Sequence, residues 1–283
     1  MSFERSDRQL TRTAKARAYS MALVTITWVL LPCSAAAPQS NAAKDDCQPL
    51  VFPVGSKEDV VAKATDFLIK VETVQQHPYW PAGSSGVTLG IGWDAGYHTR
   101  AELERVWAEL GADALARLNA ASEKKGPEAK ALIPQLKSIE VPTDVSRHVL
   151  VKSLDEYYYS FVMTVFPGLE QLPTEVKVVF ISLVFNRGLS MGHEPDWRFA
   201  KEVDRRWEFR ELRDDVKRTD MFAIYTHLGT MKRLWEASGP RGLRIRRRDE
   251  QALIRPYVDK QLRWEEKCSG RPNAPTGITA TTQ

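Results

Sequence analysis

Two glycines separated by one residue, Gly90-Ile91-Gly92, are the feature that most constrains how this chain folds. They interrupt a run in which polar and apolar residues alternate, the pattern of a half-buried strand. A single flat strand at about 3.3 Å per residue would hold Thr88 and Asp94 roughly 20 Å apart. Because glycine readily adopts positive φ angles, the segment suits a three-residue hairpin loop. We therefore predict a hairpin that pairs Leu89 with Trp93 and Thr88 with Asp94, the last two with Cβ atoms about 5 Å apart.

A helix precedes this hairpin and ends on an acidic residue. Ser56, followed three residues later by Asp59, resembles a capping box and predicts the start of the helix. The apolar residues behind it recur at three- and four-residue intervals: Val60, Ala64, Phe67, Leu68 and Val71. Glu72 falls one turn after Leu68 and so is expected at the rim of the buried face. Partial burial raises the pKa of a carboxyl group and lets it hold a proton near neutral pH, as a general acid must.

Glu72, Thr88 and Asp94 together are therefore the candidate catalytic residues. A hydroxyl beside a carboxylate, both facing a glutamate at a helix end, can hold and activate one water molecule. Simpler roles remain open for each residue. Glu72 could be a solvated residue at a helix end, Asp94 could cap the turn at Ala95-Gly96, and Thr88 could be an ordinary strand residue.

Three stretches, in this order, resemble the phage-type lysozymes. The first is Glu72 followed by Thr88-Leu-Gly-Ile-Gly92, and the second is Ile181-Ser-Leu-Val-Phe-Asn-Arg-Gly188. The third is Gly242-Leu-Arg-Ile-Arg-Arg-Arg-Asp-Glu250. No acidic residue lies between Glu72 and Thr88, where most of that family has an aspartate, whereas Asp94 follows the threonine. This order is similar to the pesticin-like branch of the family.

The resemblance implies an α+β, mainly α, lysozyme-like fold over residues 56–265, with a small β-hairpin lobe beside a larger helical lobe and a cleft between them. It implies an N-acetylmuramidase that cleaves the β-1,4 bond of peptidoglycan glycan strands by an inverting mechanism and without a cofactor. Glu72 would protonate the leaving oxygen, while Asp94 and Thr88 would hold the water. Two rivals stay open: an inactive glycan-binding protein of the same fold, and a chitin-directed hydrolase.

The N-terminal segment is expected to be a targeting signal rather than part of the fold. Basic residues precede the apolar stretch Met21–Leu31, and the small residues Ser34-Ala-Ala-Ala37 follow it. This pattern predicts a signal peptide over residues 1–37, and therefore export to the periplasm or beyond. An uncleaved anchor or a lipoprotein at Cys33 is the alternative. Residues 38–55 read as a linker, and residues 266–283 as a disordered tail.

Two cysteines, Cys47 and Cys268, remain after such a cleavage and stand near opposite ends of the mature chain. In an oxidising compartment they are expected to form a disulfide that joins the termini. For so long a loop, the chain-entropy model gives about 5 kcal/mol of stabilisation. Two unrelated free thiols are the other interpretation.

The remainder of the chain predicts a helical body. Pro173-Thr174 begins a strongly apolar helix, Glu175–Phe185, that is expected at its centre, ended by Gly188. The other predicted helices are 99–110, 112–125, 128–138, 144–165, 197–207, 209–218, 221–235 and 241–257.

Trp80, Asn186 and Arg187 are the candidate substrate-binding residues. Trp80 lies in the polar entry to the hairpin and could stack on a sugar ring, whereas Trp93 is expected to pack in the core. Asn186 either bonds the backbone at the helix end or contacts a sugar. If Asp94 is not the base, Glu194 and Asp196 are the next candidates.

Other partners are not expected. The net charge of +4 is small, and the arginines from Arg241 to Arg248 fall in a motif that the resemblance places on a structural helix, so no nucleic acid is predicted. The five histidines are scattered without the spacing of metal ligands. A monomer is expected, and an immunity or inhibitor protein is left open.

Overall fold

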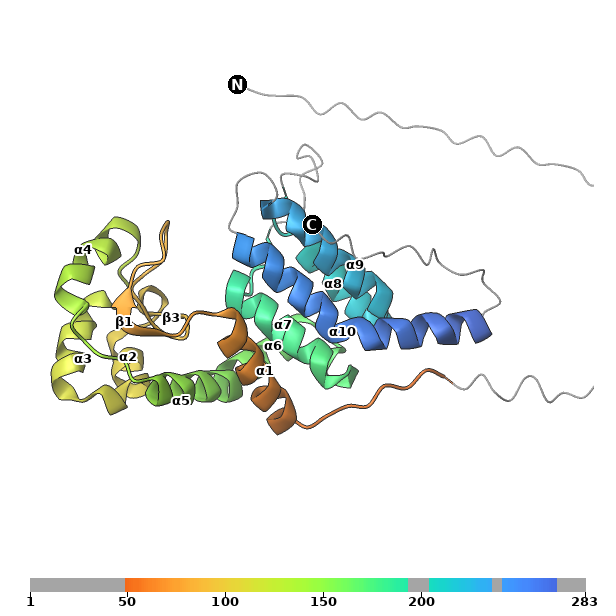
Figure 1. Cartoon of the computed structure of the whole chain (residues 1–283), viewed down its shortest axis with the longest axis horizontal. Coiled ribbons are helices and arrows are strands. Elements are labelled where there is room, and N and C mark those ends of the chain that lie inside the picture. The colour runs from red at the N-terminus through yellow and green to blue at the C-terminus, as the bar shows by residue number, and fades with distance from the viewer. Residues whose placement is uncertain (1–48, 193–203, 236–240, 269–283) are drawn as a thin grey trace, which may run out of the picture. The chain divides into compact units, whose positions relative to one another are not determined.

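The computed structural model of the chain describes residues 49–192, 204–235 and 241–268. Over these residues the fold is α+β and mainly helical, as predicted, with one antiparallel sheet in the order β1-β2-β3 (Figure 1). The strands are β1 Gln75–Tyr79, β2 Thr88–Gly90 and β3 Trp93–Asp94. The α-helices are α1 Lys57–Val71, α2 Arg100–Val106, α3 Ala112–Leu118, α4 Gly126–Leu136, α5 Thr143–Ser153, α6 Tyr159–Val165, α7 Thr174–Arg187, α8 Trp207–Arg218, α9 Met221–Thr230 and α10 Arg241–Cys268.

The predicted hairpin is confirmed in its register. Thr88 pairs with Asp94 and Leu89 with Trp93 across β2 and β3. Gly90 and Gly92 adopt φ angles of +53° and +73°, the region that glycine enters without steric cost. The turn at Gly90-Ile91-Gly92 therefore forms for the reason read from the sequence.

Strand β1, which the sequence did not predict, adds a third strand to this hairpin. Its sequence is Gln-Gln-His-Pro-Tyr, which has neither alternation nor β-branched residues. It lies at the edge of the sheet, the position where a strand tolerates a proline such as Pro78. Tyr79, its last residue, pairs with Thr88 of β2.

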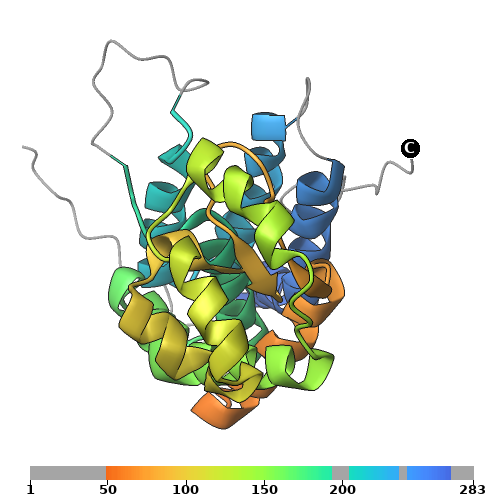
Figure 2. The same cartoon turned by 90° about the vertical axis from the view of Figure 1, so that its left-hand side faces the viewer.

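Two hydrophobic cores hold the described residues together. The smaller core packs Val87 and Leu89 of the hairpin region against Trp107, Leu118 and other residues of α2, α3 and α4. Figures 1 and 2 show these helices gathered around the sheet. The larger core unites α1 with α6 to α10.

Helix α7 is the centre of the larger core, as predicted. Every residue from Val176 to Val184 is buried, and α1 and α10 both pack against this helix. Gly188 ends the helix with a φ of +72°. The polar residue Ser182 is fully buried as well.

The predicted helix 144–165 is interrupted. Helices α5 and α6 are joined by one π-helical turn, Leu154–Tyr158. Such turns insert a residue and rotate the side chains that follow. Leu154 faces the core, while Tyr157 and Phe161 are exposed, with ring centroids 4.2 Å apart.

Two helices in the C-terminal half differ in length from the predicted ones. Helix α10 continues to Cys268, beyond the expected end at residue 257, and passes through Pro256. The first three residues of the expected tail, 266–268, are therefore helical. Residues 269–283 lie outside the described residues. Likewise, α9 stops at Thr230, and a 3₁₀ segment, Met231–Trp235, follows it.

Part of the expected linker is packed rather than free. Phe52 is buried, with its ring 5.8 Å from that of Tyr257 on α10. Lys260 donates a hydrogen bond to the carbonyl of Val51. The predicted signal peptide lies within residues 1–48, which are outside the described residues. The predicted helix 197–207 is also outside them as far as residue 203. Among the residues described, no helix combines the length and apolar character that crossing a membrane requires.

Candidate active site

Glu72 lies at the end of α1 and is partly buried, as predicted. The helix ends at Val71, and the backbone N–H of Glu72 donates to the carbonyl of Leu68. The carboxylate, 26% exposed, forms an ion pair with the guanidinium of Arg246 on α10. The partly buried position expected for Glu72 is therefore present, and the ion pair with a charged group from a distant part of the chain was not predicted.

Arg246 belongs to a buried network between α7 and α10. Its Nε donates to Ser182 Oγ at 3.0 Å, and its NH2 group donates to the Ser182 carbonyl at 2.9 Å. Ser182 Oγ donates in turn to Glu250, which also pairs with Arg247 at 2.5 Å. Burial raises the pKa of Glu250 and lowers that of Arg247, and each partner's charge offsets part of the shift.

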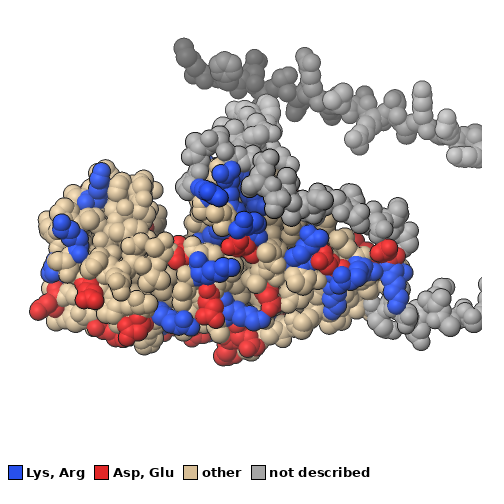
Figure 3. Space-filling model, viewed as in Figure 1, with Lys and Arg blue, Asp and Glu red and all other residues tan. Residues whose placement is uncertain are grey.

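Two arginines of the basic run belong to this network. Arg246 and Arg247 are buried and ion-paired, which agrees with the structural helix expected for this motif. On the face shown in Figure 3, the Lys and Arg side chains along α10 lie among Asp and Glu side chains.

Asp94 caps the turn that follows it. Its carboxylate accepts the backbone N–H of Gly96 at 2.9 Å and that of Gly86 at 3.0 Å to each oxygen. A Cβ at Gly86 would lie 2.3 Å from the carboxylate, so only glycine fits there. The simpler role considered for Asp94 is thus present in the structure, and two fixed donors hold the carboxylate in place.

Thr88 is buried between two partners on the sheet. The register places Tyr79, Thr88 and Asp94 in one row across the three strands, and directly paired residues project from the same face. Thr88 is 3% exposed, and its Oγ1 has no hydrogen-bond partner among the described residues. A buried hydroxyl of this kind needs a partner of its own.

The charges of Glu72 and Asp94 affect the pKa values of two tyrosines, Tyr79 and Tyr158. Burial raises the pKa of Tyr79, and the charges of Glu72 and Asp94 raise it further. The pKa of Tyr158 rises to about 12, chiefly through burial, and both carboxylates again contribute. Both carboxylates therefore act on the same two phenol groups. The ring of Tyr158 lies 5.2 Å from that of Phe185, at the end of α7.

Sequence reasoning missed both tyrosines. Tyr79 lies in the strand that was not predicted, although the short distance along the chain from Glu72 was a usable signal. Tyr158 owes its position to the π-helical turn, which no sequence pattern indicated.

Trp80 is partly buried, and its role as a platform for a sugar ring stays a prediction. Its Nε1 donates to the Ser85 carbonyl at 3.0 Å, its ring packs against the smaller core, and the ammonium of Lys130 lies 5.3 Å from the ring centroid. Trp93 packs between His98 and Trp107, with centroids 4.3 and 5.8 Å away, so its expected core role is confirmed.

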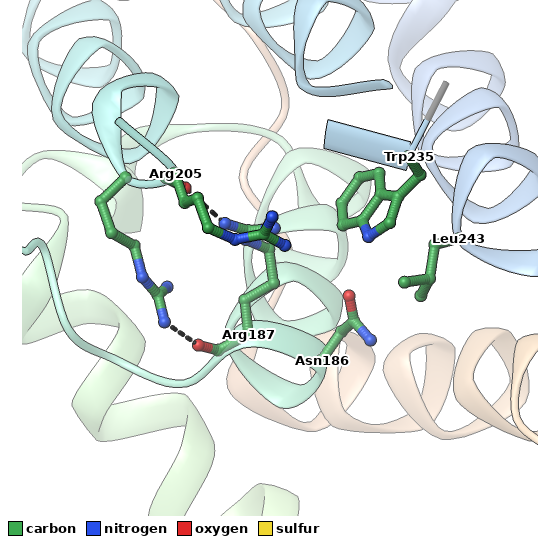
Figure 4. Close-up of a pocket in the computed structure, with 6 residues that line it drawn as sticks. Asn186, Arg187, Arg205, Trp235 and Leu243 are labelled. Atoms are coloured by element: carbon green, nitrogen blue, oxygen red, sulfur yellow. Dashed lines mark hydrogen bonds between the residues drawn. The ribbon is translucent and has the colours of Figure 1, made fainter. Parts of the chain in front are cut away.

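Asn186 and Arg187 do not join the row on the sheet but line a pocket of about 420 Å³ at the end of α7 (Figure 4). The other lining residues are Arg205, Arg206, Trp235 and Leu243. Asn186 Oδ1 has no hydrogen-bond partner among the described residues, so this atom does not make the backbone bond considered for it.

The reserve bases Glu194 and Asp196 lie outside the described residues. Within the described ranges, no group of three or more His, Cys, Asp or Glu side chains could hold a metal ion. Cys268, the last residue of α10, is disulfide-bonded. Because Cys47 lies outside the described residues, its pairing with Cys268 stays a prediction.

Comparison with protein-family models and with curated proteins gives no match. No relative therefore supplies a role for any of these residues. Function has to be argued from the geometry of the side chains and from the three motifs, and the predicted cleft between two lobes stays a prediction.

Proposed function

We propose that this chain is a peptidoglycan hydrolase with a lysozyme-like fold, an N-acetylmuramidase that cleaves the β-1,4 bond after N-acetylmuramic acid. The carrying observation is the row of Thr88 and Asp94 on the sheet, in which the N–H groups of Gly86 and Gly96 hold the Asp94 carboxylate. Export to the periplasm or beyond, and action as a monomer on glycan strands, belong to the same proposal.

In the proposed reaction Glu72 gives a proton to the glycosidic oxygen as the bond to the anomeric carbon breaks. A water held by Thr88 Oγ1 and Asp94 attacks that carbon from the opposite face, and its proton passes to Asp94. The backbone N–H groups of Gly86 and Gly96 fix the Asp94 carboxylate, so it need not reorganise during the reaction. This inverting route requires the two carboxyl groups to lie about 6.5–9.5 Å apart.

Arg246 is assigned a positioning role. Its guanidinium is itself fixed by Ser182, and it holds the Glu72 side chain at the end of α1. Proton donation requires Glu72 in its acid form, so substrate has to weaken this ion pair when it enters.

The test is digestion of purified peptidoglycan, followed by mass spectrometry of the borohydride-reduced products. Reduced N-acetylmuramic acid ends are expected, and proton NMR during the first minutes should show the α-anomer that inversion produces. Reduced N-acetylglucosamine ends, or the β-anomer, would contradict the assignment. Cleavage of chitin oligosaccharides in preference to peptidoglycan would favour the chitin-directed alternative.

A second function is favoured by two contacts. The ion pair of Glu72 with Arg246, and the cap that Asp94 forms, both occupy groups that catalysis needs. A lysozyme-fold protein that binds glycan without cleaving it would keep both contacts. Co-sedimentation with insoluble peptidoglycan, with no soluble product after long incubation, would establish this function instead.

A further inference from the structure

Among the described residues that line the pocket at the end of α7, three are arginines and none is acidic. The arginines are Arg187, Arg205 and Arg206. The pKa of Arg187 falls to about 10 through burial and the nearby cations, while Glu208 is the neighbouring acid that opposes the shift. Glu208 is already paired with Arg233 at 2.7 Å. Like charges this close repel one another, and a bound anion would offset the repulsion.

Two of these arginines donate hydrogen bonds to backbone carbonyls of the described residues. Arg187 NH2 donates to the carbonyl of Arg205, and Arg206 NH2 donates to the carbonyl of Arg187, as Figure 4 shows. Arg187 Nε and Arg206 NH1 are buried without a hydrogen-bond partner among the described residues. Within the described part of the chain these two N–H groups are therefore donors without an acceptor, and fixed donors are what an anion site requires.

The opposite wall of the pocket is apolar. Figure 4 shows Trp235 and Leu243 facing the arginines, with Asn186 between the two walls. The guanidinium of Arg187 lies 5.3 Å from the Trp235 ring centroid and 5.5 Å from that of Phe209. A volume of about 420 Å³ is the size of a small-molecule site, and apolar walls with a few fixed polar groups are typical of one.

The arginines, the Asn186 amide and the apolar wall of the pocket together match one chemical group. Arginine donors suit a carboxylate, and the indole suits a small apolar side chain. Asn186 Oδ1, which has no partner among the described residues, suits the N–H of an adjacent amide. A carboxylate, an amide N–H and a small side chain on one carbon are the C-terminal residue of a peptide. We propose that this pocket binds the free C-terminal carboxylate of a short peptide that ends in a small residue such as alanine.

The position of the pocket indicates where the bound peptide comes from, and this inference rests on the proposed function. Ser182, which anchors the Arg246–Glu72 pair, lies four residues before Asn186 and so on the same face of α7, one turn away. Peptidoglycan strands carry short peptides that end in a free carboxylate. A glycan strand at Glu72 would therefore present such a branch close to the pocket.

The experiment is isothermal titration calorimetry with diacetyl-L-lysyl-D-alanyl-D-alanine and with its C-terminal amide. The acid should bind the wild-type protein, and the amide at least tenfold more weakly. Arg205→Ala removes an exposed lining guanidinium and leaves the carbonyl that Arg187 uses, so it should weaken binding of the acid about tenfold. Asn186→Asp adds a repelling charge with little change in size and should weaken it at least as much.

Arg248→Ala is the matched control, because it removes an exposed arginine of α10 that does not line the pocket. Its affinity should stay within twofold of wild type. Equal binding of acid and amide, or equal affinities for Arg205→Ala and Arg248→Ala, would overturn the proposal. Inorganic phosphate that competes as tightly as the peptide would also overturn it, in favour of a general anion site.

The experiments distinguish a failure of the peptide-binding proposal from a failure of the hydrolase proposal. Peptide binding is measured without any cleavage, whereas hydrolysis of glycan strands from which the peptides have been removed needs Glu72 and not the pocket. Arg205→Ala should lose more activity on intact peptidoglycan than on such strands, whereas Arg248→Ala should leave the ratio of the two activities unchanged.

Discussion

Replacement of Asp94 by asparagine separates its two possible roles, because capping and catalysis respond differently. The carboxylate accepts two backbone N–H groups, one of them shared between both oxygens. Asparagine keeps one acceptor oxygen but places an NH2 group where Oδ2 was. Both bonds then lose their charge, and the Gly86 N–H faces another donor.

The cost follows from typical hydrogen-bond energies. A bond to a charged group contributes about 1.5–3 kcal/mol and a neutral one about 0.5–1.5, so two bonds lose roughly 2 kcal/mol together. For a domain of this size that loss lowers the melting temperature by about 4–8 °C. The folded population at 25 °C should hardly change, since natural domains are stable by about 5–15 kcal/mol.

Hydrolysis should respond far more strongly. If Asp94 takes the proton of the attacking water, Asp94→Asn should lower kcat on peptidoglycan by at least about 10²-fold. The control is Asp220→Asn, which changes the aspartate that caps the N-terminus of α9 and accepts the Ala223 N–H at 2.9 Å. It should lose stability without losing kcat. A kcat for Asp94→Asn within a few-fold of this control would refute the catalytic assignment.

Three further predictions concern the acid, a tyrosine and the termini. Glu72→Gln should lower kcat by about 10²–10⁴-fold, because it removes the transferable proton; a turbidity assay that finds near-normal clearing would contradict this. Since burial raises the pKa of Tyr158 to about 12 in the folded state, the unfolded chain loses its phenol proton first and folding stability should fall between pH 10 and about 12. Chemical denaturation should show a shallower fall in Tyr158→Phe, and an identical slope would rule out the contribution. Mass spectrometry without reductant should find Cys47 linked to Cys268, whereas a free Cys47 thiol would remove this link between the termini.

Local features of the fold were predictable because their causes lie within a few residues. The capping box at Ser56 forms as expected, with 3.1 Å bonds to and from Asp59. The positive φ angles of Gly90 and Gly92 close the hairpin, and this alone brings Thr88 opposite Asp94. Continuous apolar sequence placed α7 at the centre of a core, because such a helix has no face to leave in water.

The sequence did not determine the surroundings of these residues. Arg246 reaches Glu72 across 174 residues of chain, and the tyrosines reach the same site through an edge strand and a π-helical turn that carry no periodic signal. The pocket at α7 gathers side chains from four separate stretches of the chain. Hydrogen bonding and backbone sterics act over one turn and can be read locally. Ion pairs, burial and pockets depend on which helices pack together, and only the tertiary structure decides that.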